Sequence, residues 1–171
     1  MIAPVFETGR LRLRPFKADD AVPLHQILAV DGVLRYYPSP DPPGLERVER
    51  LVSLQIDHWN EHGYGWWAVE DIASEQLVGW NGLQYLPDTD EIEIGYLLAR
   101  PYWGQGLATE GARVGMEYGF SQLNIPTIIG IVHPENVASQ RVLEKIGLVF
   151  QEEAEYFGMQ CYKYLAENLE P

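Results

Sequence analysis

The sequence predicts a mixed α/β fold in which strands and helices alternate around one sheet. Residues 8–16 alternate apolar and polar side chains, which is the period of a half-buried strand. Residues 45–61 repeat apolar side chains at helical spacing. The nearly all-apolar run Thr127–Val132 is typical of a strand covered on both faces. With 171 residues, 46% hydrophobic and 22% charged, the chain is expected to form one domain, residues 1–171.

The first half of the chain is expected to contain one strand, two helices and a meander of three further strands. The strand at residues 8–16 is followed by a helix that Asp19 or Asp20 can cap and that runs to about Ala29. A proline-rich loop then leads into a longer amphipathic helix, and three alternating segments form an antiparallel meander. The loop, the second helix and the three strands are expected at residues 36–44, 45–61, 64–70, 77–85 and 90–98.

The second half is expected to add two helices and three strands. A helix over residues 106–120 carries small side chains that allow close approach to the sheet, and the buried strand 127–132 follows it. A short helix at residues 136–146 ends at Gly147, a residue suited to the left-handed cap position. The chain closes with a hairpin of residues 149–157 and 159–165, turned at Gly158.

Several residues could have a functional role, but a structural role explains each of them more simply. His58 and His62 are spaced like a metal-binding pair on a helix, but no third ligand or His-Glu-x-x-His motif accompanies them, so we expect no metal site. The single cysteine, Cys161, lies in an aromatic strand and is expected to be structural in a reducing compartment. For three residues of the meander a core position is favoured over stacking on a ligand: Trp66, Trp67 and Trp80.

The net charge of −13 argues against nucleic acid as a partner, because phosphate backbones require clustered Lys and Arg. An acidic surface instead favours cationic substrates, although it is equally compatible with a plain solubility trait. The N-terminus lacks a basic segment followed by an apolar one, and no run approaches the ~20 apolar residues of a membrane span. We therefore expect a cytoplasmic protein with no membrane partner.

The turn Gly104-Gln105-Gly106 joins an apolar strand to a helix and is a candidate anion cradle. Glycine lets the backbone approach a ligand, while free N–H groups and the positive end of the helix dipole attract phosphate. Thr109 occupies the position of a third dinucleotide-binding glycine, and no Gly-Lys-Ser/Thr follows to make a nucleotide P-loop. Taken alone, the turn is equally compatible with a tight connection that binds nothing.

Two long motifs follow each other in the second half of the chain. The motif Tyr-Trp-Gly-Gln-Gly-Leu-Ala-Thr-Glu occupies residues 102–110. The pattern Asn, two residues, Ser, then Val-Leu-Glu-Lys, one residue, Gly occupies residues 136–147. In this order the two motifs resemble the GNAT superfamily of acyl-CoA-dependent N-acetyltransferases, and within it the RimJ/RimL-like branch. The pyrophosphate signature of the family, Gln or Arg, two residues, Gly, one residue, Gly or Ala, falls on Trp103, Gly106 and Ala108. Its first element therefore departs from the family, although Trp103 still carries a backbone N–H.

The resemblance implies acetyl-CoA as cosubstrate and a mostly antiparallel sheet, flanked by helices, that splays between its fourth and fifth strands. These strands are residues 90–98 and 127–132 here. In this family the pantetheine arm lies in the opening, where backbone amides freed from the ladder bind it and polarise the thioester carbonyl. The residues implied to contact the cofactor are Tyr96, Leu97, Leu98, Trp103, Gly104, Gln105, Gly106, Leu107, Ala108, Thr109, Asn136 and Ser139. Because CoA is anionic, local cations must assist: Arg100, Arg113, Arg141 and Lys145 are candidates.

Acetyl transfer to an amine needs a base for the amine and a proton for the departing thiolate. Glu91 and Glu93 share one face of the fourth strand because they are two residues apart, and Glu93 is the preferred base, acting through water. Many members of the family place a tyrosine acid at the position of Leu143, which leaves the serine of the RimJ/RimL-like branch, Ser139, to meet the sulfur. Asn136 would bond the pantetheine chain, although both Asn136 and Ser139 equally suit the start of a helix.

The resemblance favours a protein or peptide N-terminal amine as acceptor. A polyamine, an aminoglycoside or another small amine remains open, because the expected acceptor loops at residues 33–44 and 80–87 carry no decodable signature. A third interpretation is a non-catalytic acyl-CoA-binding module. A homodimer is possible, and it is the only assembly that we consider.

Overall fold

A computed structural model describes residues 3–169 of the chain and consists of one eight-stranded sheet with helices on both faces. The strands are β1 Phe6–Glu7, β2 Leu11–Arg14, β3 Trp66–Asp71, β4 Gln76–Leu86, β5 Glu91–Leu98, β6 Thr127–Val132, β7 Val149–Tyr156 and β8 Met159–Glu167. The helices are α1 Ala21–Leu28, α2 Leu45–His62, α3 Leu107–Glu117 and α4 Val137–Lys145. None of the described helices is long and apolar enough to cross a lipid bilayer.

The strand order is β1-β2-β3-β4-β5-β6-β8-β7. Every neighbouring pair is antiparallel except β5 and β6, which run parallel. A parallel pair requires a crossover, and here the crossover is α3. The expected mixed, mostly antiparallel sheet is therefore confirmed.

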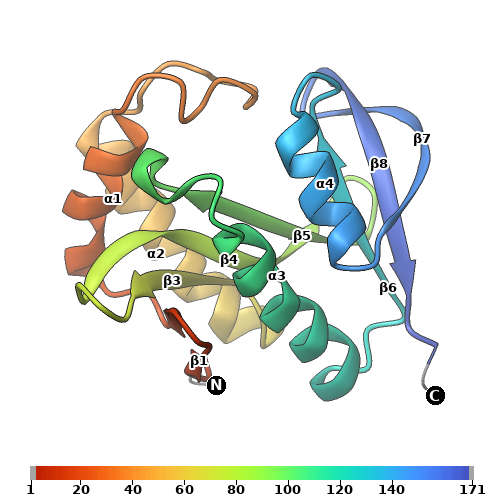
Figure 1. Cartoon of the computed structure of the whole chain (residues 1–171), viewed down its shortest axis with the longest axis horizontal. Helices are drawn as coiled ribbons and strands as arrows, with labels where there is room; N and C mark the ends of the chain where they lie inside the picture. Colours follow the sequence, from red (N-terminus) through yellow and green to blue (C-terminus); the bar gives the residue numbers. More distant parts are fainter. Residues whose placement is uncertain (1–2, 170–171) are drawn as a thin grey trace.

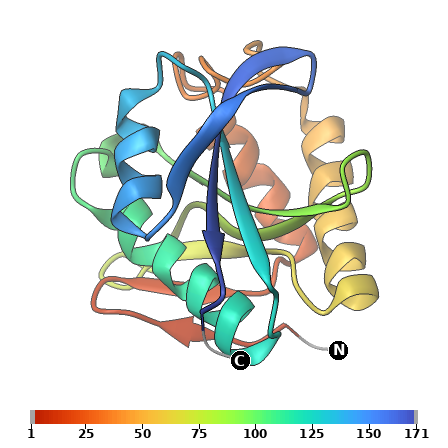
Figure 2. The same ribbon diagram turned by 90° about the vertical axis from the view of Figure 1, so that its right-hand side faces the viewer.

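Two helical layers cover the sheet. Figure 2 shows α3 and α4 on one side of the strands and α2 on the other, with α1 beside α2. Residues of α1 and α2 such as Leu24, Val48 and Val52 pack against Trp80 and Leu97 of the sheet. On the opposite face, Ala112 and Met116 of α3 pack in a second cluster with strand residues of β4, β5 and β6. The two clusters thus cover both faces of the middle strands.

The sheet splits between β5 and β6. The two strands share one matched pair, Glu93 with Ile129, whereas β4 and β5 remain paired as far as Gly79 and Leu98. The end of β5 therefore runs on beside β4 alone, while β6 diverges toward α4. Figure 1 shows β5 and β6 separating in this way, and the expected opening between the fourth and fifth long strands is confirmed.

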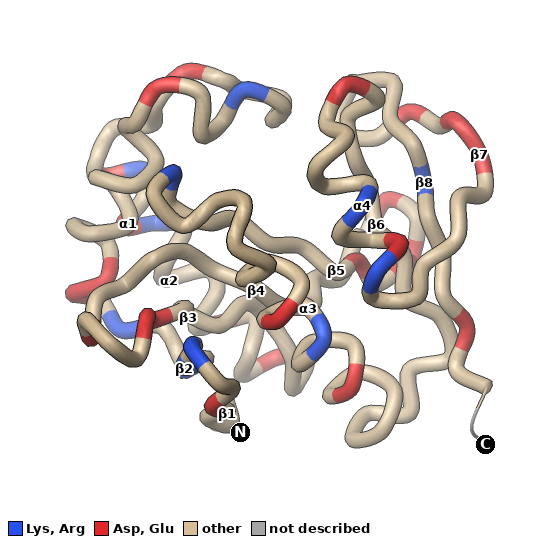
Figure 3. Tube along the Cα trace, in the orientation of Figure 1, with Lys and Arg blue, Asp and Glu red and all other residues tan. Residues whose placement is uncertain are grey.

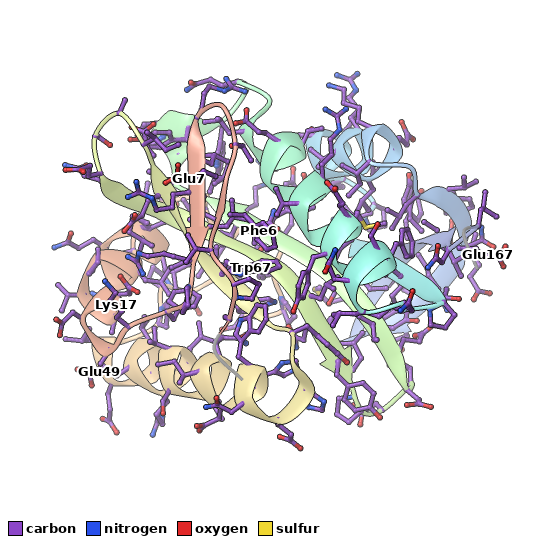
Figure 4. The ribbon with its side chains drawn as sticks, turned by 90° about the horizontal axis from the view of Figure 1, so that it is seen from below. Phe6, Glu7, Lys17, Glu49, Trp67 and Glu167 are labelled. Atoms are coloured by element: carbon purple, nitrogen blue, oxygen red, sulfur yellow. The ribbon has the colours of Figure 1, made fainter. Side chains whose placement is uncertain are left out.

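The N-terminal strand expected at residues 8–16 is a short hairpin instead. The backbone N–H of Thr8 donates to the Leu11 carbonyl at 2.8 Å, which turns the chain and separates β1 from β2. Leu11 is fully buried, as the alternation predicted. Phe6 meets Trp67 edge to face at 5.7 Å, and Figure 4 shows their side chains next to each other. This aromatic contact fixes the hairpin against β3.

The helix expected over residues 106–120 also differs in its ends. Regular helix runs from Leu107 to Glu117 and continues as one π-helical turn, Tyr118–Gln122. Gly106 precedes the helix as its N-cap with φ of +77°, a left-handed conformation that glycine adopts without strain. The helix therefore begins directly after the glycine-rich turn.

Candidate active site

A cleft of about 920 Å³ opens between the diverging strands and crosses the molecule from the α1–α2 loop to α4. Its walls come from that loop, from β3, β4 and β5, from the glycine-rich turn, and from α4 and the β7–β8 hairpin. At its rim Tyr36 stacks on His133, with ring centroids 5.3 Å apart and an interplanar angle of 29°. This contact links two segments that lie on opposite walls of the cleft.

The glycine-rich turn lines one end of the cleft and presents free donors. Gly104 and Gly106 have φ of +70° and +77°, so the chain turns sharply twice. No acceptor among the described residues faces the backbone N–H groups of residues 104–109, whereas Glu110 begins the helical ladder by donating to Gly106 at 3.0 Å. Unpaired N–H groups at the positive end of a helix dipole form an anion site. The turn therefore fits the pyrophosphate of CoA.

The backbone N–H of Trp103 is already hydrogen-bonded, contrary to the expectation that it is available to a ligand. Its N–H donates to the Arg100 carbonyl at 3.2 Å, and its indole N–H donates to the Leu98 carbonyl at 2.7 Å. The expectation that the Trp103 N–H is free for phosphate is therefore wrong for this arrangement. The half-exposed indole still lines the cleft. Gln105 likewise turns its side chain away, because its amide donates to the Pro101 carbonyl at 2.8 Å.

The N-terminal hairpin holds this turn in place, a connection that the sequence did not reveal. Arg10 donates to the Gln105 carbonyl at 2.9 Å and forms an ion pair with Glu110 at 2.7 Å. Thr8 donates to the same Glu110 carboxylate at 2.6 Å. Burial alone would raise the pKa of Glu110, but the hydrogen bonds from Thr8 and Arg10 lower it. Glu110 is thus an anion in the first turn of α3, where the helix dipole also favours negative charge.

The free end of β5 offers backbone groups to the opening. Because Ala99 donates to Val78 of β4 at 2.7 Å and alternate residues point to opposite edges, Leu97 directs its backbone toward β4. Tyr96 and Leu98 direct theirs toward the split. Their carbonyls accept from side chains across it, Tyr96 from the Tyr37 hydroxyl at 3.3 Å and Leu98 from the indole N–H described above. Of the three expected backbone contacts, Tyr96 and Leu98 thus have the required orientation, and Leu97 lines the cleft with its side chain.

Glu93 lies where β5 and β6 part. It belongs to the one matched pair of the two strands, with Ile129, and also lines the cleft. The backbone N–H of Ile131, the next residue of β6 with the same orientation as Ile129, donates to its carboxyl group. Burial raises the pKa of Glu93 to about 8, and this hydrogen bond opposes the shift only in part. A carboxyl group with such a pKa can exchange a proton near neutral pH.

Glu91, the second candidate base, is held in a separate network. Its carboxylate is paired with the Lys163 ammonium and accepts from the Tyr156 hydroxyl at 2.5 Å. Burial alone would raise the pKa of Glu91, but these two hydrogen bonds lower it. Glu91 does not line the cleft. The structure therefore separates two carboxylates that the sequence pattern grouped together.

Ser139 and Asn136 lie at the start of α4. Asn136 is the N-cap residue, and its side-chain oxygen accepts from the Ser139 backbone N–H at 3.2 Å. The Ser139 hydroxyl lies 2.9 Å from the Tyr96 phenol, which reaches it from β5 across the split. Burial raises the pKa of Tyr96, so the phenol stays protonated at neutral pH. Leu143, where many members of the family place a tyrosine acid, is a buried core residue.

Cationic side chains gather on the cofactor side of the cleft. Of the four expected residues, Arg100, Arg141 and Lys145 line the cleft, whereas Arg113 lies exposed on α3 outside it. Figure 3 shows Lys and Arg positions on α4 together with an acidic one, and further Asp and Glu positions on α3, the loops and β7. The local charge of the cleft is thus opposite in sign to that of the chain as a whole.

Aromatic residues form the opposite end of the cleft. Trp67 is fully buried in the core, as expected. Trp66 and Trp80 stack with ring centroids 3.7 Å apart, and although both pack in the core they also line the cleft. Tyr37 joins them from the α1–α2 loop, a position that the proline-rich sequence around it marked only as a loop. Cys161 of β8 is buried at the cleft wall, and burial raises the pKa of its thiol.

Comparison with known proteins identifies the family. The acetyltransferase (GNAT) domain family matches residues 10–149. The Bacillus subtilis protein YkkB is 35% identical over 149 residues, which cover 82% of this chain and 83% of YkkB. The spermidine N(1)-acetyltransferase of Escherichia coli K12 is 28% identical over 175 aligned positions, covering 94% of this chain and 91% of that enzyme.

A solved structure has the same fold. RimL, described as a ribosomal alpha-N-protein acetyltransferase in complex with coenzyme A, superposes with a TM-score of 0.81 at 18% identity, covering 96% of this chain and 98% of that one. The split sheet and the free amides at the start of α3 fit the acetyl-CoA that this family uses. The chain therefore belongs to the GNAT family of N-acetyltransferases.

Proposed function

We propose that this N-acetyltransferase transfers the acetyl group of acetyl-CoA to the α-amine of a protein or peptide N-terminus, with residues 1–171 acting as one catalytic domain. The observation that supports this chemistry best is the half-buried carboxyl group of Glu93, which lies where β5 and β6 separate and lines the cleft. The assignment of an N-terminal amine as acceptor rests on the RimJ/RimL-like sequence motif at residues 102–110.

Cofactor binding is assigned to two sets of backbone amides. Those of residues 104–109 receive the pyrophosphate, and those of Tyr96 and Leu98 receive the pantetheine arm. The side-chain amide of Asn136 and the indole of Trp103 complete the wall. Acetyl-CoA supplies an activated thioester, so the protein has to align the amine with it and move two protons.

We assign the base to Glu93 and not to Glu91. The Glu93 carboxylate takes a proton from the acceptor ammonium, directly or through one water, and its pKa of about 8 suits proton exchange near neutral pH. Glu91 is already an ion-paired anion outside the cleft, which makes it a weaker base and keeps it from the amine. Ser139 donates its hydroxyl proton to the departing sulfur, and Tyr96 stands behind it as a second hydroxyl.

A small-molecule amine is the second candidate acceptor, because a spermidine acetyltransferase aligns with most of the chain. Release of free thiol from acetyl-CoA, measured with N-terminal peptides, spermidine and an aminoglycoside, separates the candidates. Mass spectrometry of the products then identifies the acetylated nitrogen. Faster thiol release with peptides supports the proposal, and turnover confined to the small amines overturns it.

A further inference from the structure

The acceptor end of the cleft has an apolar and aromatic wall. Trp66 and Trp80 lie almost parallel, with an interplanar angle of 11°, and line the cleft on the same sheet face as Glu93. Phe157 and Met159 of the β7–β8 hairpin line it from the other side. Such a surface is stabilised by covering it with apolar groups of a ligand, and stacked indoles also accept planar ones.

This end of the cleft holds a single carboxyl group. Among the described residues that line the cleft, the acidic ones are Glu93 and Glu135, and Glu135 is exposed at the rim. The neighbouring acidic side chains are bonded to other groups. Glu91 pairs with Lys163, and Asp90 accepts from the Tyr85 hydroxyl at 2.8 Å. The cationic lining residues outnumber the acidic ones, since they comprise Arg35, Arg100, Arg141 and Lys145.

A second positive charge on the acceptor would therefore lack a partner. One ammonium group can meet Glu93, but a second one a few ångströms away would be desolvated against tryptophan and methionine side chains. Placing a charge in such surroundings without a counter-charge is unfavourable. Burial also holds Glu93 partly protonated at neutral pH, which reduces the negative charge available even to the first ammonium.

We infer that the acceptor is a monoamine whose amino group is attached to an uncharged, apolar or aromatic group, and that polyamines are poor acceptors. For a peptide, this group is the side chain of the first residue. The inference rests on the proposed function, because it narrows the acceptor of the same reaction. It also means that the net charge of −13 does not describe the cleft that the acceptor enters.

Gln84 provides a way to reverse the selectivity. It is the cross-strand partner of Glu93 on β4, and both residues line the cleft. Side chains opposite each other on antiparallel strands lie about 5 Å apart. Gln84→Glu therefore adds a carboxylate of nearly the same size beside Glu93. Gln76→Glu is the matched control, because it makes the same change at an exposed position of the same strand that does not line the cleft.

The test compares kcat/KM for butylamine and putrescine, which differ by a second amino group, with phenethylamine and spermidine as further members of the panel. The wild-type protein should prefer butylamine over putrescine by at least ~10-fold, even though putrescine offers two reactive amines. Gln84→Glu should shift this ratio toward putrescine by about fivefold or more, whereas Gln76→Glu should leave it unchanged.

The possible outcomes distinguish an error in the inferred acceptor class from an error in the proposed reaction. Turnover of putrescine equal to or faster than that of butylamine in the wild-type protein would overturn the assigned acceptor class while leaving the acetyltransferase intact. An unchanged ratio in Gln84→Glu would show that charge at this position does not select the acceptor, and would also overturn it. Absence of thiol release with every amine, peptides included, would overturn the proposed acceptor reaction itself, and this inference with it.

Discussion

The Tyr96 phenol oxygen lies 2.9 Å from the Ser139 hydroxyl oxygen, and the pair joins β5 to α4 across the opening in the sheet. Tyr96 also lies 3.1 Å from the Ser139 backbone carbonyl, and its single proton can point either to that carbonyl or to the Ser139 hydroxyl. When the phenol donates to the hydroxyl, the Ser139 proton is free for an acceptor in the cleft. The two hydroxyls form a short path along which a proton lost by Ser139 can be replaced from Tyr96.

Ser139→Ala should lower kcat by about tenfold or more, because the departing thiolate loses its nearest proton donor. Tyr96→Phe should lower kcat by a smaller factor, since the serine remains but its proton is no longer replaced from the phenol. Calorimetric titration should give unchanged acetyl-CoA affinity for both variants. A Ser139→Ala protein with full kcat would mean that the thiolate leaves without a protein acid and that the serine only begins α4.

Glu93→Gln should lower kcat/KM by about 10²-fold, because glutamine cannot accept the amine proton. In the wild-type protein the active form has Glu93 ionised, so the rate should rise with pH and level off above a pKa near 8. The variant should lose this limb of the profile. Glu91→Gln is the matched control and should retain the limb, because Glu91 lies outside the cleft. An unchanged profile in Glu93→Gln would remove Glu93 from the mechanism.

The same residue gives a prediction for stability that does not depend on activity. The folded-state pKa of Glu93 is raised from 4.5 to about 8, so the folded protein holds this proton more tightly than the unfolded chain. Stability should therefore fall as pH rises from about 4.5 to about 8, by a few kcal/mol, since one pKa unit corresponds to about 1.4 kcal/mol. Glu93→Gln should match the wild-type Tm at pH 5 and exceed it by several degrees at pH 9. A constant difference in Tm across this range would contradict the raised pKa.

The sequence predicted the elements better than the contacts between them. The alternation of Leu11 and Leu13, the helical spacing before Gly63 and the all-apolar strand β6 each follow from local periodicity, and each is present. The glycine-rich turn was also recognised, because glycine marks left-handed backbone within the sequence itself.

Local periodicity could not predict the contacts between segments that are distant in the sequence. The pairing of Arg10 with Glu110 joins residues 100 positions apart, and the contact of Tyr96 with Ser139 joins residues 43 apart. Strand periodicity put Glu91 and Glu93 on one face but could not show that Lys163 neutralises only Glu91. The difference between the two carboxylates arises from β8, which enters the sheet beside β6 through long-range pairing.

Arg10→Met should weaken acetyl-CoA binding by about fivefold without unfolding the protein. The guanidinium holds the Gln105 carbonyl and the Glu110 carboxylate, so its loss frees the glycine-rich turn to move and adds an ordering cost to binding. Arg12→Met is the matched control, because Arg12 pairs with Glu7 and Glu70 away from the turn. Calorimetry on both variants checks the prediction, and equal affinities for Arg10→Met and wild type would show that the turn needs no support from the hairpin.

Gly106→Val should abolish measurable acetyl-CoA binding while leaving most of the fold intact. Gly106 has φ of +77°, which a β-branched residue adopts only with strain, and a side chain there would cover N–H groups that face the pyrophosphate. The strain alone must be separated from the loss of the anion site. Gly147→Val provides this control, because Gly147 also has positive φ, +98°, with no heavy atom within 4 Å of an added Cβ, and it does not line the cleft. Both variants should lose a similar amount of thermal stability, but only Gly106→Val should lose the heat of acetyl-CoA binding. Equal loss of binding in the two variants would mean that strain, and not the backbone donors of this turn, accounts for the effect.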